Sequence, residues 1–433
     1  MNSTTADSTN TIADSANKIA DNTNKNVSRS RIGFSDAMAK RCVLALCEKI
    51  AVGHLLIKDG DETYHFGQAQ SDADITAHIV VHDASTYRAM FLHGSVGAGE
   101  AYMAKAWSTP DLLSVIQLMI RNLSLLNSFD SERPWLNRLT AKLGHWLNRN
   151  NREGSRKNIA AHYDLSNDFF QTFLDPTLMY SSAIYPSTDA SLEQASLHKL
   201  DTICRKLQLS SADHLLEIGT GWGGLAMHAA THYGCQVTTT TISKEQFDLA
   251  SERIKAAGLE DRITVLFEDY RDLQGGYDKL VSIEMIEAVG HEYYETYFAQ
   301  CSKLVKPNGL MLIQAITIPD QRYDYARTNT DFIKKYIFPG GCLPSNAVIA
   351  RCVEKCTDLQ IVHLDDISLH YARTLADWHT RFKASLDTIQ RMQFDERFCL
   401  MWEFYLKYCE GGFRERAVSA SQILFAKPQF RFR

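Results

Sequence analysis

The feature that most constrains this chain is a glycine-rich turn between an apolar strand and a helix. Residues 215–224 read LLEIGTGWGG, so the glycines have the spacing G-x-G-x-G-G and Glu217 precedes them. Glycine tolerates the positive backbone dihedrals of a tight turn, and the helix that follows offers unpaired amide groups. A dinucleotide-binding turn would instead read G-x-G-x-x-G, with an acidic residue about 20 positions later. The turn therefore predicts an α/β fold that binds another nucleotide-like ligand.

Strands and helices alternate after this turn. Residues 235–242 are rich in β-branched side chains and predict a strand, and Ser243 begins an S-x-x-Q capping box that predicts the next helix. Residues 263–267 and 277–283 predict two further strands. The first is followed by the polar residues 268–272, which suit either an adenine site or a solvated loop. The second ends in a loop with two carboxylates, Glu284 and Glu287.

The order of these segments resembles class I S-adenosylmethionine (SAM)-dependent methyltransferases, and more closely the cyclopropane-fatty-acyl-phospholipid synthase family. That family includes enzymes that methylate mycolic acids and enzymes that make mid-chain methyl-branched fatty acids. The supporting segments are 162–170 (HYDLSNDFF), 179–183 (MYSSA), the glycine turn, 268–272, 277–291 and 336–345 (YIFPGGCLPS). The resemblance implies a Rossmann-like methyltransferase domain with a helical lid, preceded by a small mixed α/β domain.

Four regions are predicted along the chain. Residues 1–30 are rich in small polar side chains and are predicted to be a disordered tail. Residues 31–132 are predicted to form the N-terminal accessory domain, with a hairpin at Asp59-Gly60-Asp61. Residues 133–157 form a basic amphipathic linker, which suits either packing between domains or contact with an anionic membrane surface. Residues 158–433 are predicted to be the SAM-dependent methyltransferase domain.

Composition excludes several classes of protein. The net charge of -5 argues against nucleic-acid binding, which needs a basic field. The 10 cysteines have no paired metal-ligand spacing, so we expect no metal site and a reducing compartment. No apolar run approaches the roughly 18 residues of a membrane span. We therefore expect a cytoplasmic protein, peripherally associated with the inner membrane face, and the oligomeric state stays open, a homodimer included.

The resemblance also implies the cofactor SAM and the residues that bind it. They are Tyr180 and Ser181 at the carboxylate end, Gly219 and Gly221 in the turn, Thr241 and Gln246 near the ribose, and Asp269 with Tyr270 near the adenine. One departure from many methyltransferases is the missing carboxylate at the ribose position.

In the family a bound bicarbonate accepts the proton, held by a cysteine, a glutamate, a histidine, the backbone at an isoleucine and a tyrosine. The matching positions here are Ser182, Glu287, Gln314, Ile316 and Tyr371. Two of them depart from the pattern, because serine replaces cysteine and glutamine replaces histidine. Serine and glutamine can still donate hydrogen bonds to a small anion, but neither carries charge near neutral pH. Glu287 is also a candidate to act as the base directly.

Cys409 matches a cysteine once proposed to be catalytic in the family. The other interpretation is a buried thiol that packs as a small hydrophobic group. The helix around it is predicted to be the lid over an acyl slot, in the aromatic-rich region 323–416. Aromatic faces attract a cation without donating a lone pair, which suits a transient carbocation.

Three functions follow from this reasoning. The leading one is transfer of the SAM methyl group to the double bond of an unsaturated fatty-acyl chain in phospholipid, through a carbocation, to form a cyclopropane fatty acid. The second is the same transfer ending in a methylene- or methyl-branched fatty acid of the 10-methyl type, since a hydride shift before proton loss gives a branch. The third is a non-catalytic protein that binds lipid or SAM.

Overall fold

The computed structural model describes residues 36–68, 74–123 and 166–431. These residues fall into two compact units, which we describe separately. One unit takes the described residues that fall within Met1–Gly144, Asn329–Pro339 and Trp378–Ala417, and the other takes those within His145–Thr328, Gly340–Asp377 and Val418–Arg433. The predicted tail (1–30) and linker (133–157), with the start of the 162–170 motif, lie outside the described residues.

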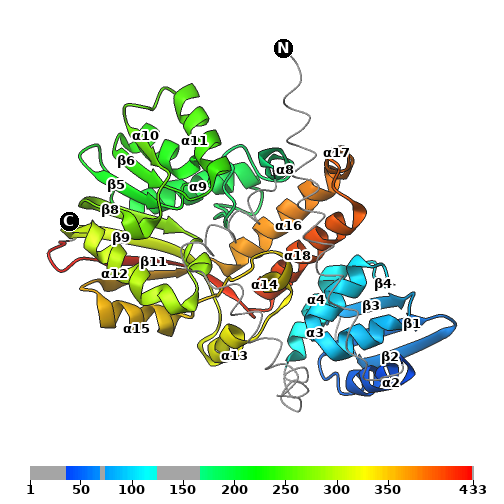
Figure 1. The fold of residues 1–433 in the computed structure, drawn as a ribbon. Helices are drawn as coiled ribbons and strands as arrows, with labels where there is room; N and C mark the ends of the chain where they lie inside the picture. The colour runs from blue at the N-terminus through cyan, green and yellow to red at the C-terminus, as the bar shows by residue number, and fades with distance from the viewer. Residues whose placement is uncertain (1–35, 69–73, 124–165, 432–433) are drawn as a thin grey trace. The chain divides into compact units, whose positions relative to one another are not determined.

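The second unit is built on a seven-stranded sheet with the order β10-β11-β9-β8-β5-β6-β7 (Figure 1). Its strands are β5 (His214–Ile218), β6 (Gln236–Thr240), β7 (Ile263–Leu266), β8 (Tyr277–Ile283), β9 (Val305–Thr317), β10 (Gln360–Asp366) and β11 (Ser419–Ala426). Strands β5 to β9 pair in parallel, whereas β11 is antiparallel to both β9 and β10. The strand order reverses at β5, and α/β sheets bind ligands at the carboxyl edge beside such a point.

Helices cover both faces of this sheet (Figure 1). Helices α12 (Tyr294–Leu304) and α15 (Asn346–Cys356) contribute to one core, and α9 (Leu192–Lys206), α10 (Gly224–Tyr233) and α11 (Lys244–Ala256) to the other. The unit also contains α8 (Asn167–Gln171), α13 (Tyr323–Thr328) and the first part of α16 (Ser368–Ala384), with 3-10 turns η1 (Tyr270–Asp272), η2 (Ile286–Ala288), η3 (His291–Tyr293) and η4 (Asp320–Arg322). Successive strand residues enter opposite cores: Leu216 and Leu280 pack toward α12, while Leu215 and Val281 pack toward α9 and α10.

The first unit contains a four-stranded sheet with the order β2-β1-β3-β4. Its elements are α2 (Asp36–Cys47), β1 (Gly53–Asp59), β2 (Glu62–Gln68), β3 (Thr76–Val81), α3 (Ser85–Met103), β4 (Trp107–Ser108), α4 (Leu112–Arg121), α14 (Phe332–Tyr336), α17 (Leu386–Arg391) and α18 (Glu396–Arg414). The predicted hairpin is confirmed, since Asp59 pairs with Glu62 around Gly60. The α/β fold class predicted from the sequence is likewise confirmed.

The predicted lid helix, α18, packs inside the first unit. The ring of Phe404 lies 4.6 Å from that of Phe332 and 5.8 Å from that of Tyr102, and a Cβ at Gly99 would meet Phe332 at 2.4 Å. Compact units and independently folding domains are different things, so the predicted domain bounds and the lid role stay predictions. Within the ranges that the structure describes, no helix has the length and apolar character to cross a bilayer.

Candidate active site

The glycine turn joins β5 to α10 and has the predicted geometry. Gly219, Gly221 and Gly223 have φ angles of +100°, +51° and +83°, a region that glycine adopts without strain. A Cβ at Gly221 would meet nothing within 4 Å, so the backbone there faces open space. No side chain caps the first turn of α10, which leaves its amides available to a ligand. The turn therefore fits the predicted cofactor.

Lys199 and Glu217, which precedes the turn, are two buried side chains whose charges interact. Sequence reasoning did not find this pair. Lys199 of α9 is fully buried and donates to the Ser181 hydroxyl over 2.8 Å. Desolvation lowers the pKa of Lys199 to about 8 and raises that of Glu217, on β5, to about 8. Glu217 also accepts from the Thr239 hydroxyl at 2.6 Å. An amphipathic helix predicts an exposed lysine, so no sequence signal pointed to Lys199.

The residues predicted near the ribose lie at the end of β6. The Thr241 hydroxyl donates to Oε1 of Gln246 over 2.8 Å, and Ser243 caps α11 as predicted. The Gln246 side chain thus bonds to Thr241, and the described part of the chain shows only the Ser243 half of the predicted capping box.

The adenine candidates, Asp269 and Tyr270, follow β7. Asp269 accepts from both the Nε and Nη2 of Arg271, at 2.8 and 2.6 Å, and its side chain is 5% exposed. The Tyr270 ring packs against Tyr297 at 5.5 Å and under the Arg271 guanidinium. Tyr180, at the other end of the predicted cofactor site, packs against Phe170 at 5.2 Å. The roles of these residues toward SAM stay predictions.

A second group of residues, which we call the carboxylate centre, surrounds Glu284. Its Oε1 accepts from the Ser182 amide at 2.9 Å and from Nε2 of Gln314 at 2.7 Å. Its Oε2 accepts from the Tyr371 hydroxyl at 2.6 Å. Three of the positions predicted to hold bicarbonate therefore converge on this one side chain. From the sequence, Glu284 is one of two carboxylates in the loop after β8, with no role predicted for it.

Glu287 lies one turn further on, in η2. Its Oε1 accepts from the Ile316 amide, and its Oε2 is buried with no hydrogen-bond partner among the described residues. Desolvation, reinforced by the charge of Glu284, raises the pKa of Glu287 to about 8. Burial also raises the pKa of Glu284, but the hydrogen bonds from Tyr371, Gln314 and Ser182 oppose that shift. The hydrogen bonds therefore favour the charged form of Glu284 more than that of Glu287.

A chain of hydrogen bonds orients the Gln314 amide. Lys206 donates to Oε1 of Gln422 at 2.6 Å, and Nε2 of Gln422 donates to Oε1 of Gln314 at 2.9 Å. Gln314 and Gln422 are direct cross-strand partners on β9 and β11. With its oxygen held in this way, Gln314 donates from Nε2 to Glu284 and, at 3.2 Å, to the Ser182 carbonyl. This chain comes from segments far apart in sequence, and no local pattern predicts it.

The predicted bicarbonate ligands do not fit that anion as they stand. The donors from Ser182, Gln314 and Tyr371 bond to Glu284, and the Ile316 amide bonds to Glu287. The Ser182 hydroxyl itself donates to the Ala183 carbonyl at 2.9 Å. A further small anion would also meet the charge of Glu284 in a desolvated site, which is unfavourable.

Cys409 lies on α18, in the first unit. Burial raises the pKa of its thiol, so the neutral form dominates at neutral pH. A neutral thiol is a poor nucleophile, which favours the packing interpretation over a catalytic one. The predicted catalytic role of Cys409 stays a prediction.

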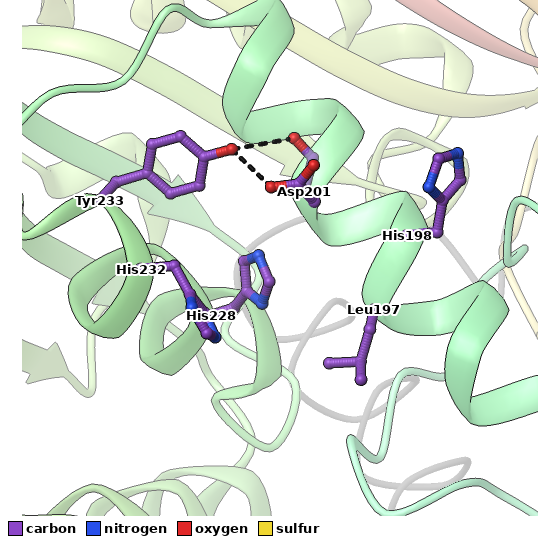
Figure 2. Close-up of a pocket in the computed structure, with 6 residues that line it drawn as sticks. All are labelled: Leu197, His198, Asp201, His228, His232 and Tyr233. Carbon is purple, nitrogen blue, oxygen red and sulfur yellow. Dashed lines mark hydrogen bonds between the residues drawn. The ribbon is translucent and has the colours of Figure 1, made fainter. Parts of the chain in front are cut away.

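Figure 2 shows a separate hollow between α9 and α10. It is lined by Leu197, His198, Asp201, His228, His232 and Tyr233, with the Tyr233 hydroxyl donating to Asp201 at 2.6 Å. None of the predicted site residues lines it. Across the described ranges, no group of three or more His, Cys, Asp or Glu side chains is arranged to hold a metal ion.

The sheet order, the glycine turn and the acidic loop after β8 define the class of SAM-dependent methyltransferases. Comparisons with known proteins agree, since the family described as mycolic acid cyclopropane synthetase matches residues 150–423. The chain belongs to this family of cyclopropane-synthase-like, SAM-dependent methyltransferases.

Two relatives and a solved structure show the range of the family. The chain is 41% identical over 333 residues to the tuberculostearic acid methyltransferase UfaA1 of Mycobacterium tuberculosis, covering 74% of this chain and 76% of the relative. It is 36% identical over 354 residues to the cyclopropane-fatty-acyl-phospholipid synthase of Escherichia coli, covering 81% and 88%. The mycolic acid cyclopropane synthase CmaA1, solved with S-adenosylhomocysteine (SAH) and CTAB, is 31% identical with a TM-score of 0.59, covering 63% of this chain and 98% of that one.

Proposed function

We propose that this enzyme transfers the methyl group of SAM to the double bond of an unsaturated fatty-acyl chain in phospholipid. The observation that carries the proposal is that the carboxylate centre adjoins the glycine turn. A Cβ at Gly219 would lie 3.5 Å from Cγ of Met285, the residue after Glu284. Ser181, which accepts from Lys199, directly precedes Ser182, whose amide donates to Glu284. A proton acceptor beside a methyl donor is what methyl transfer to an alkene requires.

When bound, SAM supplies an electrophilic methyl group on a sulfonium. The chain's own residues provide the rest of the chemistry. The turn and the open first turn of α10 bind the cofactor, and the carboxylate centre receives the proton that must leave after the new carbon–carbon bond forms. Buried surroundings such as those of Glu287 exclude water, which would otherwise add to the carbocation.

The product follows from which proton leaves and when. The proposal favours a methylene-branched chain, formed by a hydride shift before proton loss. Two points support it: positions 182 and 314 depart from the cyclopropane pattern and belong to a centre organised around Glu284, and a relative named for tuberculostearic acid is 41% identical. A cyclopropane remains the second candidate, which the 36% identity to the synthase of Escherichia coli favours.

Gas chromatography with mass spectrometry tests this proposal. Cells that express the chain should accumulate a fatty acid one methylene heavier than an unsaturated precursor. A ring and a methylene branch are isomers, so retention time and fragmentation distinguish them. Glu295, an exposed residue of α12, gives a control in Glu295→Gln, which should leave the profile unchanged. If no new fatty acid and no label from methyl-labelled SAM enters the lipid, the enzyme proposal fails in favour of a binding protein.

The proposal extends to location and assembly. Because the acyl chains of phospholipid lie inside a bilayer, the protein would act from the cytoplasmic face as a peripheral protein, and a homodimer would be compatible with this. Flotation with vesicles of anionic phospholipid tests the membrane contact, and light scattering at several concentrations tests the dimer. Protein that stays at the bottom of the gradient at low salt would contradict peripheral binding.

A further inference from the structure

We propose that Glu284 is the proton-accepting group of this enzyme, a carboxylate built into the chain in place of bicarbonate. The inference rests on the proposed methyl transfer and names the residue that completes it. It also predicts that turnover needs no bicarbonate. The donors, the backbone, the charges and the reaction balance at the carboxylate centre all support this inference.

The donors around Glu284 match those predicted to hold bicarbonate. The Ser182 amide, the Gln314 amide group and the Tyr371 hydroxyl reach Glu284 at 2.9, 2.7 and 2.6 Å. These are three of the positions that the family resemblance assigns to bicarbonate. A carboxylate and a bicarbonate share the same planar pair of oxygens, so the same donors suit both. Of about four acceptor positions on a carboxylate, the described donors use three, which leaves one for a substrate proton.

The backbone of Glu284 has an unusual conformation. Its φ angle is +50°, a left-handed conformation that is uncommon for residues other than glycine and concentrates at functional sites. The Glu284 amide donates to the Gln314 carbonyl at 2.7 Å, which holds this conformation. The side chain is therefore directed toward its donors by a backbone that a glycine would adopt freely.

The two neighbouring carboxylates, Glu284 and Glu287, differ in how well their charged forms are stabilised. Glu284 has three donors, two of them side chains, whereas Glu287 has only backbone donors and one buried oxygen without a partner among the described residues. Two neighbouring desolvated carboxylates do not both ionise easily, so the one with more hydrogen-bond donors keeps the charge more readily. Glu284 is thus the base, and Glu287 is the neutral partner. This differs from the sequence-based hypothesis that Glu287 acts as the base directly.

The reaction balances with Glu284 as the base. After methyl transfer the acyl chain carries a carbocation. For the methylene branch, a hydride first shifts from the methylated carbon to the neighbouring cationic carbon; for the ring, no shift occurs. A C–H bond of the transferred methyl group then breaks, its electron pair forms the second bond of the alkene or the closing bond of the ring, and the proton goes to the carboxylate of Glu284. The protonated group then returns its proton to water when product leaves. No oxidant, reductant or second anion enters this balance.

Binding of 13C-labelled bicarbonate tests the inference without turnover. The full-length wild type should show no binding by NMR line broadening or calorimetry, because its own carboxylate uses the donors. Glu284→Gly should bind the anion, since the glycine fits φ +50° and leaves the three donors free. Glu284→Gln should not bind, because its amide still fills the space. SAH binding by all three proteins checks that they are folded. Bicarbonate binding by the wild type, or its absence in the glycine variant, would overturn the inference.

Turnover in CO2-depleted buffer is the second test. The wild type should transfer label from SAM to cis-unsaturated phospholipid vesicles at the same rate with or without added bicarbonate. Glu284→Gly should lose at least about 100-fold, the scale of a general base, and regain part of the rate with bicarbonate or formate. A wild type that needs bicarbonate, or a Glu284→Gln variant with full activity, would contradict the inference. If no labelled lipid forms at all but the binding pattern holds, the proposed function fails while the carboxylate assignment survives.

Discussion

The glycine turn and the carboxylate centre are neighbours in space that are built in different ways. The turn consists of consecutive residues, 219–224, whose conformations follow from glycine itself. The carboxylate centre instead draws on the loop at Ser182, the loop after β8, the strand β9 and the helix α16. A local motif tolerates change elsewhere in the chain, whereas a centre of this kind depends on every element that supplies a donor.

Apart from the substitutions of Glu284 itself, the largest effect is expected from the turn. Gly221→Ala places a side chain in the open space that the backbone faces, at a left-handed φ that costs about 1–2 kcal/mol for alanine. We expect the affinity for SAH to fall roughly tenfold or more, measured by calorimetry. Gly258→Ala is the matched control, since Gly258 also has a positive φ (+66°) and open space but lies after α11. Equal losses of SAH affinity in both variants would show that the turn acts through stability alone.

The next effect is expected at the donor from α16. Tyr371→Phe removes a hydrogen bond to the Glu284 anion, so we expect the methyl-transfer rate at pH 7 to fall about tenfold, the scale of a hydrogen bond to a charged group. Because that bond lowers the pKa of Glu284, its loss should move the pH–rate profile toward higher pH. SAH affinity should not change. A uniform loss at every pH would argue for a purely structural role.

A smaller effect concerns stability and pH. The folded-state pKa of Glu287 is raised to about 8, above its unfolded value, so the folded protein holds more protons between the two values. Stability should therefore fall as pH rises from about 5 to 8, by at most about 1.4 kcal/mol per pH unit for one proton. Glu287→Gln should remove this part of the decline in a denaturant titration. An unchanged pH dependence would mean that Glu287 is ionised in the folded protein.

The smallest effect is expected at Ser182. Its hydroxyl donates to Ala183, and only its amide serves Glu284. Ser182→Cys, which restores the family residue, should change the barrier by less than about 1 kcal/mol, below fivefold in rate. A large loss or gain, measured in the vesicle assay, would show that the side chain acts in the centre after all.

How far sequence reasoning reached can be judged at single residues. Ser243 was predicted to cap α11 and does so, because a cap is a contact with the next few amides. Gln246 was expected to complete the box but bonds to Thr241, since a longer side chain can reach a neighbouring strand end. Lys199 could not be found, because burial of a lysine depends on carboxylates from other elements, such as Glu217 and Glu284.

The sequence by itself determined the fold class, the family and the glycine turn, because each rests on contacts between residues near one another in the chain. It also identified the positions of Ser182, Gln314, Ile316 and Tyr371. Only the tertiary structure decided that three of them direct their donors to Glu284, because that depends on how two loops, a strand and a helix pack together. The identity of a base is set by the donors that surround it, and those come from distant segments of the chain.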